Sequence, residues 1–356
     1  MAIHSIRLQH FRSYTDATFA LDPGVNIVVG PNGRGKTNLL EALYVLCRGK
    51  SFRVADSELL QHGTDWFRVD GQVDGQPRIL TLKKVDAKFE KRLQVAGATK
   101  TRLSAREQLR VVLFEPRDMQ LLTGSPERRR EYLDAILEQL EVGYARTLSH
   151  YRRALTQRNA LLKQAHGVPA DHMFVWNVRL SELGAQVVMR RREIIAELDA
   201  QATTTYNHIS GTKASVRIRY EDQHPDAAPE QLASVLLHGL EKKYAQDSQR
   251  GYTSIGPHRD DLVITLNEAP ASTSASRGET RSLVVMLKLL EARLLDAHYE
   301  DRPLMLLDDV FGELDASRRQ ALAHYLVNYQ TVITTTDADM ITEGLAHPGH
   351  VITIER

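Results

Sequence analysis

The chain has 356 residues, of which 42% are hydrophobic and 26% are charged, and its formal net charge is +1. These proportions are typical of globular proteins and exclude fibrous, disordered and low-complexity classes. It has no run of about 18 apolar residues, and its first residues lack the apolar core of a signal peptide, so we expect a cytoplasmic protein. The single cysteine, Cys47, excludes an intramolecular disulfide and most cysteine-based metal sites.

Charge is unevenly distributed along the chain. Basic side chains are in excess over residues 1–200, whereas acidic side chains are in excess over residues 201–356. This gradient is compatible with a basic face for a polyanion. Solvated helix faces would give the same totals, so both interpretations stay open.

The first 115 residues have mainly the alternating apolar pattern of β-strands. This pattern predicts strands at residues 5–11, 17–21, 25–29, 67–73, 79–85 and 111–114. One helix is expected among them, and its apolar side carries Leu39, Leu40, Leu43, Leu46 and Cys47. The first third of the chain is therefore β-rich.

From Ser125 onward the pattern becomes helical, with Ser125 as a suitable N-cap and Pro126 as the first helical residue. Amphipathic stretches cover residues 127–140, 144–164 and 174–207, and Gly167, Pro169 and Asp171 separate the last two. We then expect a strand at 215–220, a helix at 229–248, a strand at 262–266, a small polar run at 269–279, a helix at 280–299 and a strand at 304–307. No heptad pattern is long enough for an extended coiled coil.

A glycine-rich loop follows the predicted strand at 25–29. Its residues are Gly30, Pro31, Asn32, Gly33, Arg34, Gly35, Lys36 and Thr37, and Asn38 opens the next helix. The spacing is that of a phosphate loop between a strand and a helix. Lys36 would reach the β and γ phosphates of a nucleotide, and the Thr37 hydroxyl would hold Mg²⁺.

A phosphate loop needs an acidic partner at the end of a neighbouring buried strand. Asp308 follows the apolar strand at 304–307 and is the expected metal carboxylate, with Asp309 as the expected general base. An Asp-Asp pair after a strand can also be a plain helix N-cap, but the phosphate loop favours the nucleotide site.

The triplet His258, Arg259 and Asp260 resembles part of a kinase catalytic loop. The asparagine expected five residues after the aspartate is Thr265, and no Asp-Phe-Gly triplet occurs, so the kinase interpretation is excluded. One histidine beside Asp260 and Asp261 is also too few ligands for a nuclease metal site. We expect a structural or dimer-contact network instead.

Four stretches resemble the RecF family, in the SMC-like branch of ATP-binding-cassette ATPases. They are FEPRDMQLLTGSPERRREYLD (114–134), GPHRDDL (256–262), ASRGETRSLVVMLKL (275–289) and LLDDVFGELD (306–315). The resemblance implies an α/β, two-lobed, SMC-head-like P-loop ATPase. It also implies that lobe I comprises residues 1–113 and 300–356, and that the mainly helical lobe II comprises 114–299 with the signature motif at 274–279.

The same resemblance implies an ATP-induced homodimer in which the phosphate loop of one subunit faces the signature of the other. Ser276 and the amide of Gly278 would then bind the γ-phosphate at a helix N-terminus. Glu279 and Thr280 stand where cassette signatures more often have glutamines. Arg12 matches a short motif on which such heads rest the nucleotide, and Gln61 is a candidate Q-loop ligand of Mg²⁺.

Asp309 stands where many cassette ATPases have glutamate. Because it is one methylene shorter, we hypothesise slow hydrolysis that times dissociation, so that the protein is a weak DNA-dependent ATPase used as a switch.

The resemblance further implies binding of duplex and gapped DNA, and work with RecO and RecR in loading RecA at gaps and in SOS induction. The candidate phosphate contacts are Arg128, Arg129, Arg130, Arg152, Arg153, Arg190, Arg191 and Arg192, on predicted helices. Solvated ion pairs are the usual alternative for such residues. We expect no base readout, because no aromatic stacking platform is apparent.

Two alternative functions stay open. A head-only chromosome protein of the SMC type would need a long coiled-coil arm, which the chain lacks. A transporter energy-coupling subunit would carry a switch histidine where this chain has Thr336 and Asp337.

Overall fold

The computed structural model describes residues 2–164, 170–337 and 349–354, although it leaves the side chains of residues 170, 171 and 313 undescribed. The chain divides into two compact units. The first comprises Met1–Asp118, Thr205–Thr212 and Arg281–Arg356, and the second comprises Met119–Thr204 and Lys213–Thr280. The predicted interruption at Gly167 and Pro169 lies outside the described residues.

The first unit contains a five-stranded parallel sheet. Its strands are β3 (Val25–Val29), β8 (Val111–Phe114), β12 (Leu304–Asp308), β13 (Thr331–Thr335) and β14 (His350–Thr353). Their order is β14-β3-β13-β12-β8. Strand β13 therefore lies between β3, which leads into the phosphate loop, and β12, which ends at Asp308.

The second sheet of this unit is antiparallel and six-stranded. It is formed by β1 (Ile3–Phe11), β2 (Tyr14–Ala20), β4 (Trp66–Val73), β5 (Gln76–Val85), β6 (Lys88–Val95) and β7 (Ala98–Lys100). The order is β2-β1-β4-β5-β6-β7. Sequence analysis missed β6 and β7, because Lys88, Glu90, Lys91 and Arg92 interrupt the apolar alternation of β6.

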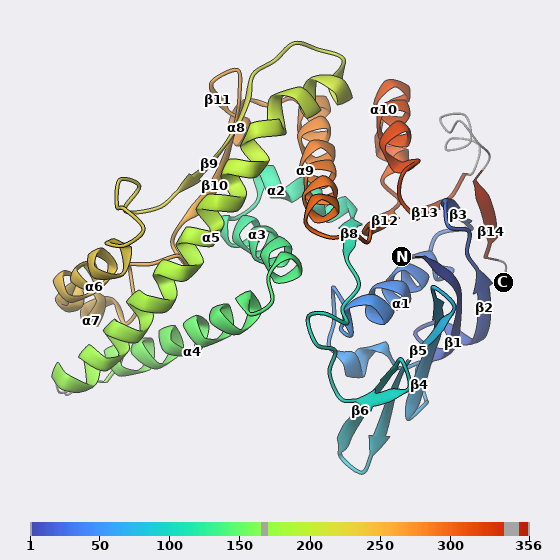
Figure 1. The fold of residues 1–356 in the computed structure, drawn as a ribbon, viewed down its shortest axis with the longest axis horizontal. Helices are drawn as coiled ribbons and strands as arrows, with labels where there is room; N and C mark the ends of the chain where they lie inside the picture. The colour runs from blue at the N-terminus through green and yellow to red at the C-terminus, as the bar shows by residue number, and fades with distance from the viewer. Residues whose placement is uncertain (1, 165–169, 338–348, 355–356) are drawn as a thin grey trace. The chain divides into compact units, whose positions relative to one another are not determined.

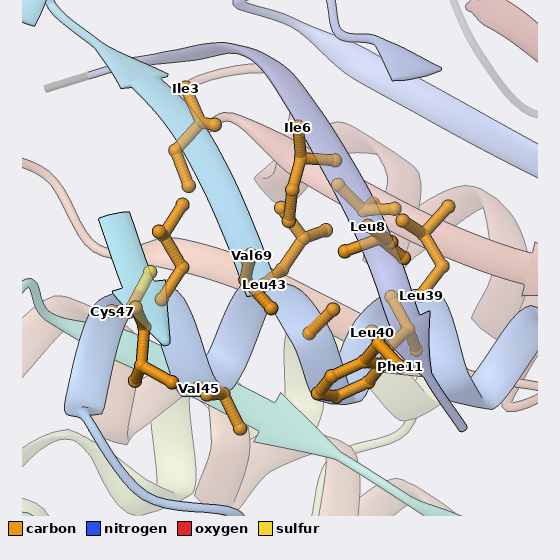
Figure 2. Close-up of a cluster of buried hydrophobic side chains, with 14 of the residues drawn as sticks. Ile3, Ile6, Leu8, Phe11, Leu39, Leu40, Leu43, Val45, Cys47 and Val69 are labelled. Atoms are coloured by element: carbon orange, nitrogen blue, oxygen red, sulfur yellow. The ribbon is translucent and has the colours of Figure 1, made fainter. Parts of the chain in front are cut away.

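Helix α1 (Lys36–Arg48) connects these two sheets through one hydrophobic core. Figure 2 shows Leu39, Leu40 and Leu43 of α1 against side chains of β1 and β4. The same cluster includes Leu306 of β12. Cys47 is buried in it, and burial raises the pKa of its thiol to about 12, so the cysteine is a packing residue.

The first unit also contains several helical elements. They are η1 (Asp56–Leu59), η3 (Phe311–Glu313), α10 (Ala316–Leu326) and most of α9 (Arg277–His298), while η2 (Pro116–Met119) leads out of the unit. Residues 114–118 and 281–299, which the sequence assigns to lobe II, are clustered with this unit, where Lys288 of α9 pairs with Asp118.

The second unit is mainly helical (Figure 1). Its helices are α2 (Gln120–Thr123), α3 (Pro126–Leu140), α4 (Tyr144–Leu162), α5 (Ala170–Ser210), α6 (Leu232–Lys242), α7 (Tyr244–Arg250) and α8 (Ala271–Ser274), although the last turns of α5 belong to the first unit. A small antiparallel sheet has the order β11-β10-β9 and is formed by β9 (Val216–Glu221), β10 (Asp261–Leu266) and β11 (Ala269–Pro270).

Two predicted segments differ from the structure. The single helix expected at 229–248 is two helices, because Lys243 leaves the helical region with φ −89° and ψ 0°. The polar run expected at 269–279 contains β11 and the short helix α8. Within the described ranges, none of the helices has the length and apolarity that a bilayer crossing requires.

A buried polar network in the second unit explains the motif around His258. The ring accepts a hydrogen bond at Nδ1 from the Tyr151 hydroxyl (2.6 Å), and Nε2 donates to the Thr253 carbonyl (3.0 Å). The Tyr220 hydroxyl donates to Asp260 (2.7 Å), and Arg129 pairs with Asp261. These contacts join α3, α4, β9 and β10, so the motif has a structural role within this unit.

Burial shifts the pKa values of two neighbouring groups of this network in opposite directions. It lowers the pKa of His258 to about 4 and raises the pKa of Asp260 to about 7. Between pH 4 and 6.5 the unfolded histidine binds protons that the folded one excludes, so its contribution to stability rises with pH. Between pH 3.8 and 7 the folded Asp260 holds a proton that the unfolded one has lost, so its contribution falls with pH.

We therefore predict that single substitutions reveal opposite pH profiles. Relative to the wild type, the unfolding free energy of Asp260→Asn rises from pH 4 to 7, because the falling contribution of Asp260 is removed. That of His258→Gln falls, because the rising contribution of His258 is removed. Urea unfolding followed by Trp176 fluorescence at four pH values measures both. Parallel profiles in the two variants would contradict the prediction.

Candidate nucleotide site

Two glycines of the loop at residues 30–35 have no room for a side chain. A Cβ on Gly30 would lie 2.9 Å from the Ile354 carbonyl oxygen, and one on Gly35 would lie 2.7 Å from Ser13 Oγ. Gly35 also has φ 103°, in the left-handed region, and is the N-cap of α1. Larger residues at these two positions would displace the loop from the end of β3.

Lys36 lies within the loop and is nearly buried. Its Nζ donates to the carbonyl oxygens of Gly30 (2.6 Å) and Pro31 (3.1 Å) and to Asn32 Oδ1 (3.3 Å). The ammonium group is thus held inside the curve of the loop, where the N-terminus of α1 adds its positive dipole end. This arrangement suits an anionic ligand with several oxygen acceptors.

Thr37 and Asp308, which are 271 residues apart in sequence, meet at the edge of the parallel sheet. The Thr37 hydroxyl lies 2.9 and 3.0 Å from the two carboxylate oxygens of Asp308. Thr334 of the intervening strand β13 also donates to Asp308 (2.8 Å). These oxygen donors fit Mg²⁺, which prefers hydroxyl, carboxylate and phosphate oxygens.

Asp309 is exposed and has a constrained backbone. Its φ is 53°, in the left-handed region, and its N–H donates to the Thr334 hydroxyl (3.0 Å). Aspartate tolerates this conformation better than most residues. The strand end therefore directs Asp308 toward Thr37 and fixes the backbone from which Asp309 extends.

Arg12 lies beside α1 but is anchored by an acidic residue. It donates two hydrogen bonds to Glu41, which is fully buried and also bonds Arg53 and Ser51. Charge and hydrogen bonding from these partners outweigh desolvation and lower the pKa of Glu41. Next to this cluster, Asn38 donates to Ser13 (2.9 Å), so Arg12, Ser13 and Asn38 are held close to the loop.

The candidate metal ligand Gln61 lies elsewhere. Its backbone N–H donates to the His10 carbonyl (2.8 Å), and its amide group contacts His10 (3.0 Å) and Thr15 (2.9 Å). These contacts tie Gln61 to the antiparallel sheet rather than to Thr37 or Asp308. A role in holding Mg²⁺ gains no support from this position.

Sequence reasoning missed Glu115, which follows β8 at the same sheet edge as Asp308. Phe114 pairs with Leu307, so the two acidic residues come next on adjacent strands. Burial raises the pKa of Glu115, and the negative charge of Asp308 adds to this shift, while Arg117 opposes it through a 2.6 Å hydrogen bond. Only the strand register reveals this neighbour, since nothing in the sequence aligns β8 with β12.

The proposed signature lies in the second unit, at the beginning of α9. The Ser276 N–H donates to Glu279 Oε2 (2.8 Å), and the Glu279 N–H donates to Ser276 Oγ (3.3 Å). This is a capping box, which orders the first turn containing Gly278. The carboxylate of Glu279 thus has a capping function where cassette signatures more often have glutamine.

The eight candidate DNA-binding arginines differ in their surroundings. Arg191 is 3% exposed and pairs with the buried Asp134, so it is not available to a phosphate. Arg129 and Arg192 form bidentate contacts with Asp261 and Asp222. Arg130 donates to the Asp260 carbonyl (2.7 Å). These four arginines therefore form hydrogen bonds and ion pairs between elements of the second unit.

Of the remaining four arginines, three are exposed and Arg128 is partly exposed. Arg152 and Arg153 are exposed on α4, although Arg152 also approaches Asp134 at 3.4 Å. Arg128 contacts Gln120, and Arg190 contacts Glu141 and Glu193. Arg128 is partly exposed, as are Arg129, Arg130 and Arg192, and of the eight candidates Arg191 is the buried one.

The loop, the Thr37–Asp308 contact and the two-unit α/β fold define a P-loop nucleotide-binding protein of the SMC-head type. The profile of the RecF/RecN/SMC N-terminal domain matches residues 2–353. DNA replication and repair protein RecF of Herpetosiphon aurantiacus is 36% identical over 95% of this chain and 94% of its own length. RecF of Halalkalibacterium halodurans is 35% identical over 100% and 98%. The chain belongs to the RecF family.

Solved structures agree with this membership. The structure of the recombination mediator protein RecF-ATPrS in the RecFOR pathway matches with a TM-score of 0.88 and 28% identity, covering 99% of this chain and 96% of that chain. An SMC head bound to the C-terminal winged-helix domain of ScpA has a TM-score of 0.58 at 15% identity, covering 99% and 93%. This second likeness shows the shared fold alone.

Proposed function

We propose that this protein is an ATP-gated DNA-binding protein of recombinational repair and replication restart. The observation that carries the proposal is the meeting of Thr37 with Asp308 beside the phosphate loop. Phosphate oxygens would replace the loop carbonyls as acceptors of the Lys36 ammonium group. Thr37 and Asp308 would hold Mg²⁺, which would neutralise charge that develops on the phosphates.

ATP would stabilise a homodimer in which the capped N-terminus of α9 contacts the γ-phosphate bound by the other subunit. Ser276 and the Gly278 amide would supply that contact. The dimer would bind duplex and gapped DNA through exposed cations and would work in the cytoplasm with RecO and RecR to load RecA. The related RecF-ATPrS and RecF-ATP structures belong to the RecFOR pathway, which supports these partners.

The first experiment is steady-state ATP turnover at increasing protein concentration, with and without gapped duplex DNA. A composite dimer site gives turnover that rises faster than linearly with concentration and is stimulated by DNA. Turnover that is proportional to concentration and indifferent to DNA would contradict the proposal. The same result would favour the alternative of a transporter energy-coupling subunit.

Asp309→Glu tests the role of the short acidic side chain. We expect turnover to increase several-fold and the lifetime of the DNA complex to shorten, because the longer side chain places its carboxylate closer to an attacking water. The left-handed backbone at this position makes glutamate less stable by about 1 kcal/mol, so thermal unfolding is measured in parallel. Unchanged turnover and lifetime in a folded variant would refute slow hydrolysis as a timing device.

A further inference from the structure

The hairpin of β5 and β6 extends beyond its neighbours in the antiparallel sheet (Figure 1). Pairing of β4 with β5 ends at Trp66 and Lys83, and pairing of β6 with β7 begins at Leu93. Among the described strands, residues 84–85 of β5 therefore pair only with 88–89 of β6, and residues 90–92 of β6 pair only with β5. The Lys84 N–H still donates to the Asp65 carbonyl (2.6 Å), so the open edge of the distal hairpin is that of β6 over residues 88–92.

The side chains on this distal part are strongly basic. Lys83, Lys84 and Lys88 are exposed within six residues of chain. The acidic residues nearby are Asp65, Asp86 in the turn and Glu90. Glu90 lies opposite Lys83 in the register and 3.3 Å from Arg92. Lys91 points to the body of the unit, where it contacts Asp56 (2.5 Å) and Gly49, so it belongs to the fold rather than to the exposed tip.

An aromatic side chain shares a face of the hairpin with Lys84, whereas Lys83 and Lys88 lie on the other face. Phe89 is 45% exposed and Val85 is 37% exposed. Phe89 lies directly opposite Lys84 in the hairpin register, so the two side chains share one face. A ring and a cationic group thus lie side by side at the tip.

Protection of an open sheet edge explains only part of this pattern. Lysines on an edge strand discourage pairing with other chains. An exposed phenylalanine on the same open strand has the opposite effect, because it favours association. A polyanion that also presents flat apolar groups is complementary to both features, and DNA with unpaired bases has that chemistry.

We propose that the hairpin tip, residues 83–89, contacts DNA at a junction between duplex and single strand. Lys83, Lys84 and Lys88 bind backbone phosphates, and the Phe89 ring stacks on an unpaired base. The inference rests on the proposed DNA-binding function and names the element that would prefer gapped substrates. Base identity is not read, because stacking accepts every base.

The test measures DNA binding by fluorescence anisotropy in the presence of ATPγS. The probes are a blunt duplex, a gapped duplex and a single strand, at potassium chloride concentrations from 50 to 300 mM. The phosphate variant is Lys83→Gln/Lys84→Gln/Lys88→Gln, and its control is Lys213→Gln/Lys242→Gln/Lys243→Gln, which removes the same charge from exposed positions of the second unit. Phe89→Ala is compared with Phe174→Ala, another exposed phenylalanine.

The phosphate variant is expected to reduce the magnitude of the log-log salt slope by about 2 to 3, since each phosphate contact contributes about 0.9. Phe89→Ala is expected to weaken binding to the gapped and single-stranded probes about fivefold or more, while duplex binding changes less than about twofold. ATP-dependent dimerisation should be unchanged in both variants, which verifies that they fold.

Two results would overturn the proposal. One is a salt slope of the phosphate variant equal to that of its control. The other is an equal effect of Phe89→Ala on all three probes, which excludes stacking at a junction. If the wild-type protein binds no probe, the proposed DNA-binding function fails instead, so the two failures are distinguishable.

Discussion

Lys36→Met is expected to reduce ATP turnover by about 100-fold or more and to abolish ATP-dependent dimerisation. The reason is that the Lys36 ammonium group lies inside the curve of the phosphate loop, with acceptors only 2.6 and 3.1 Å away. Loss of one such preorganised donor typically costs two to three orders of magnitude in rate. Methionine has a neutral, unbranched side chain that is one heavy atom shorter than that of lysine, and it cannot donate to phosphate.

This prediction is checked by steady-state turnover and by light scattering with and without ATP. Lys213→Met is the control, since Lys213 is an exposed lysine of the second unit. Thermal unfolding without nucleotide should differ from the wild type by no more than about 1 kcal/mol, because the loop carbonyls that lose Lys36 gain access to water. Retained turnover in Lys36→Met would remove this loop from the proposed mechanism.

Arg158→Met is expected to destabilise the second unit by about 3–5 kcal/mol. The Arg158 side chain is fully buried and pairs with Asp247, which is also fully buried, at 2.8 Å. It also donates to Asn177 (2.7 Å) and Thr253 (2.8 Å). Removing the arginine leaves the Asp247 carboxylate charged and unpaired in the interior, and this is the origin of the large effect.

Urea unfolding followed by fluorescence measures this effect. Trp66 lies in the first unit and Trp176 in the second, so a Trp66→Phe background reports on the second unit alone. Arg153→Met, on the exposed side of the same helix, is the matched control and should change stability by less than about 0.5 kcal/mol. Adding Asp247→Asn to Arg158→Met should recover part of the loss. Equal stabilities of the two single variants would contradict the assignment.

The two halves of the nucleotide site were accessible to sequence reasoning because each has a local pattern. The loop from Gly30 to Thr37 has fixed spacing after a strand, and Asp308 ends an apolar run. Their meeting at 2.9 Å depends on strand order, which places β13 between β3 and β12. Thr334 of β13, which also bonds Asp308, could not be identified without that order.

The burial and the hydrogen-bond partners of individual side chains could not be predicted from local sequence patterns. Arg191 and Arg153 look alike in the sequence, yet one is buried against Asp134 and the other is exposed. Gln61 lies at only a loose spacing from the phosphate loop, and its partners in the structure are His10 and Thr15 of the antiparallel sheet. Burial and pairing depend on which helices and strands pack together, and a run of arginines carries no information about that.

The sequence by itself determined the phosphate loop, the acidic strand end, the helical middle of the chain and membership of the RecF family. These features depend on short spacings and periodicities that survive any packing. Only the tertiary structure decided the strand register that brings Glu115 beside Asp308, the buried pairs of the second unit and the open hairpin around Phe89. The physical reason is that strand pairing and burial bring together residues that are distant in sequence. These contacts stabilise the protein only when the whole unit is folded.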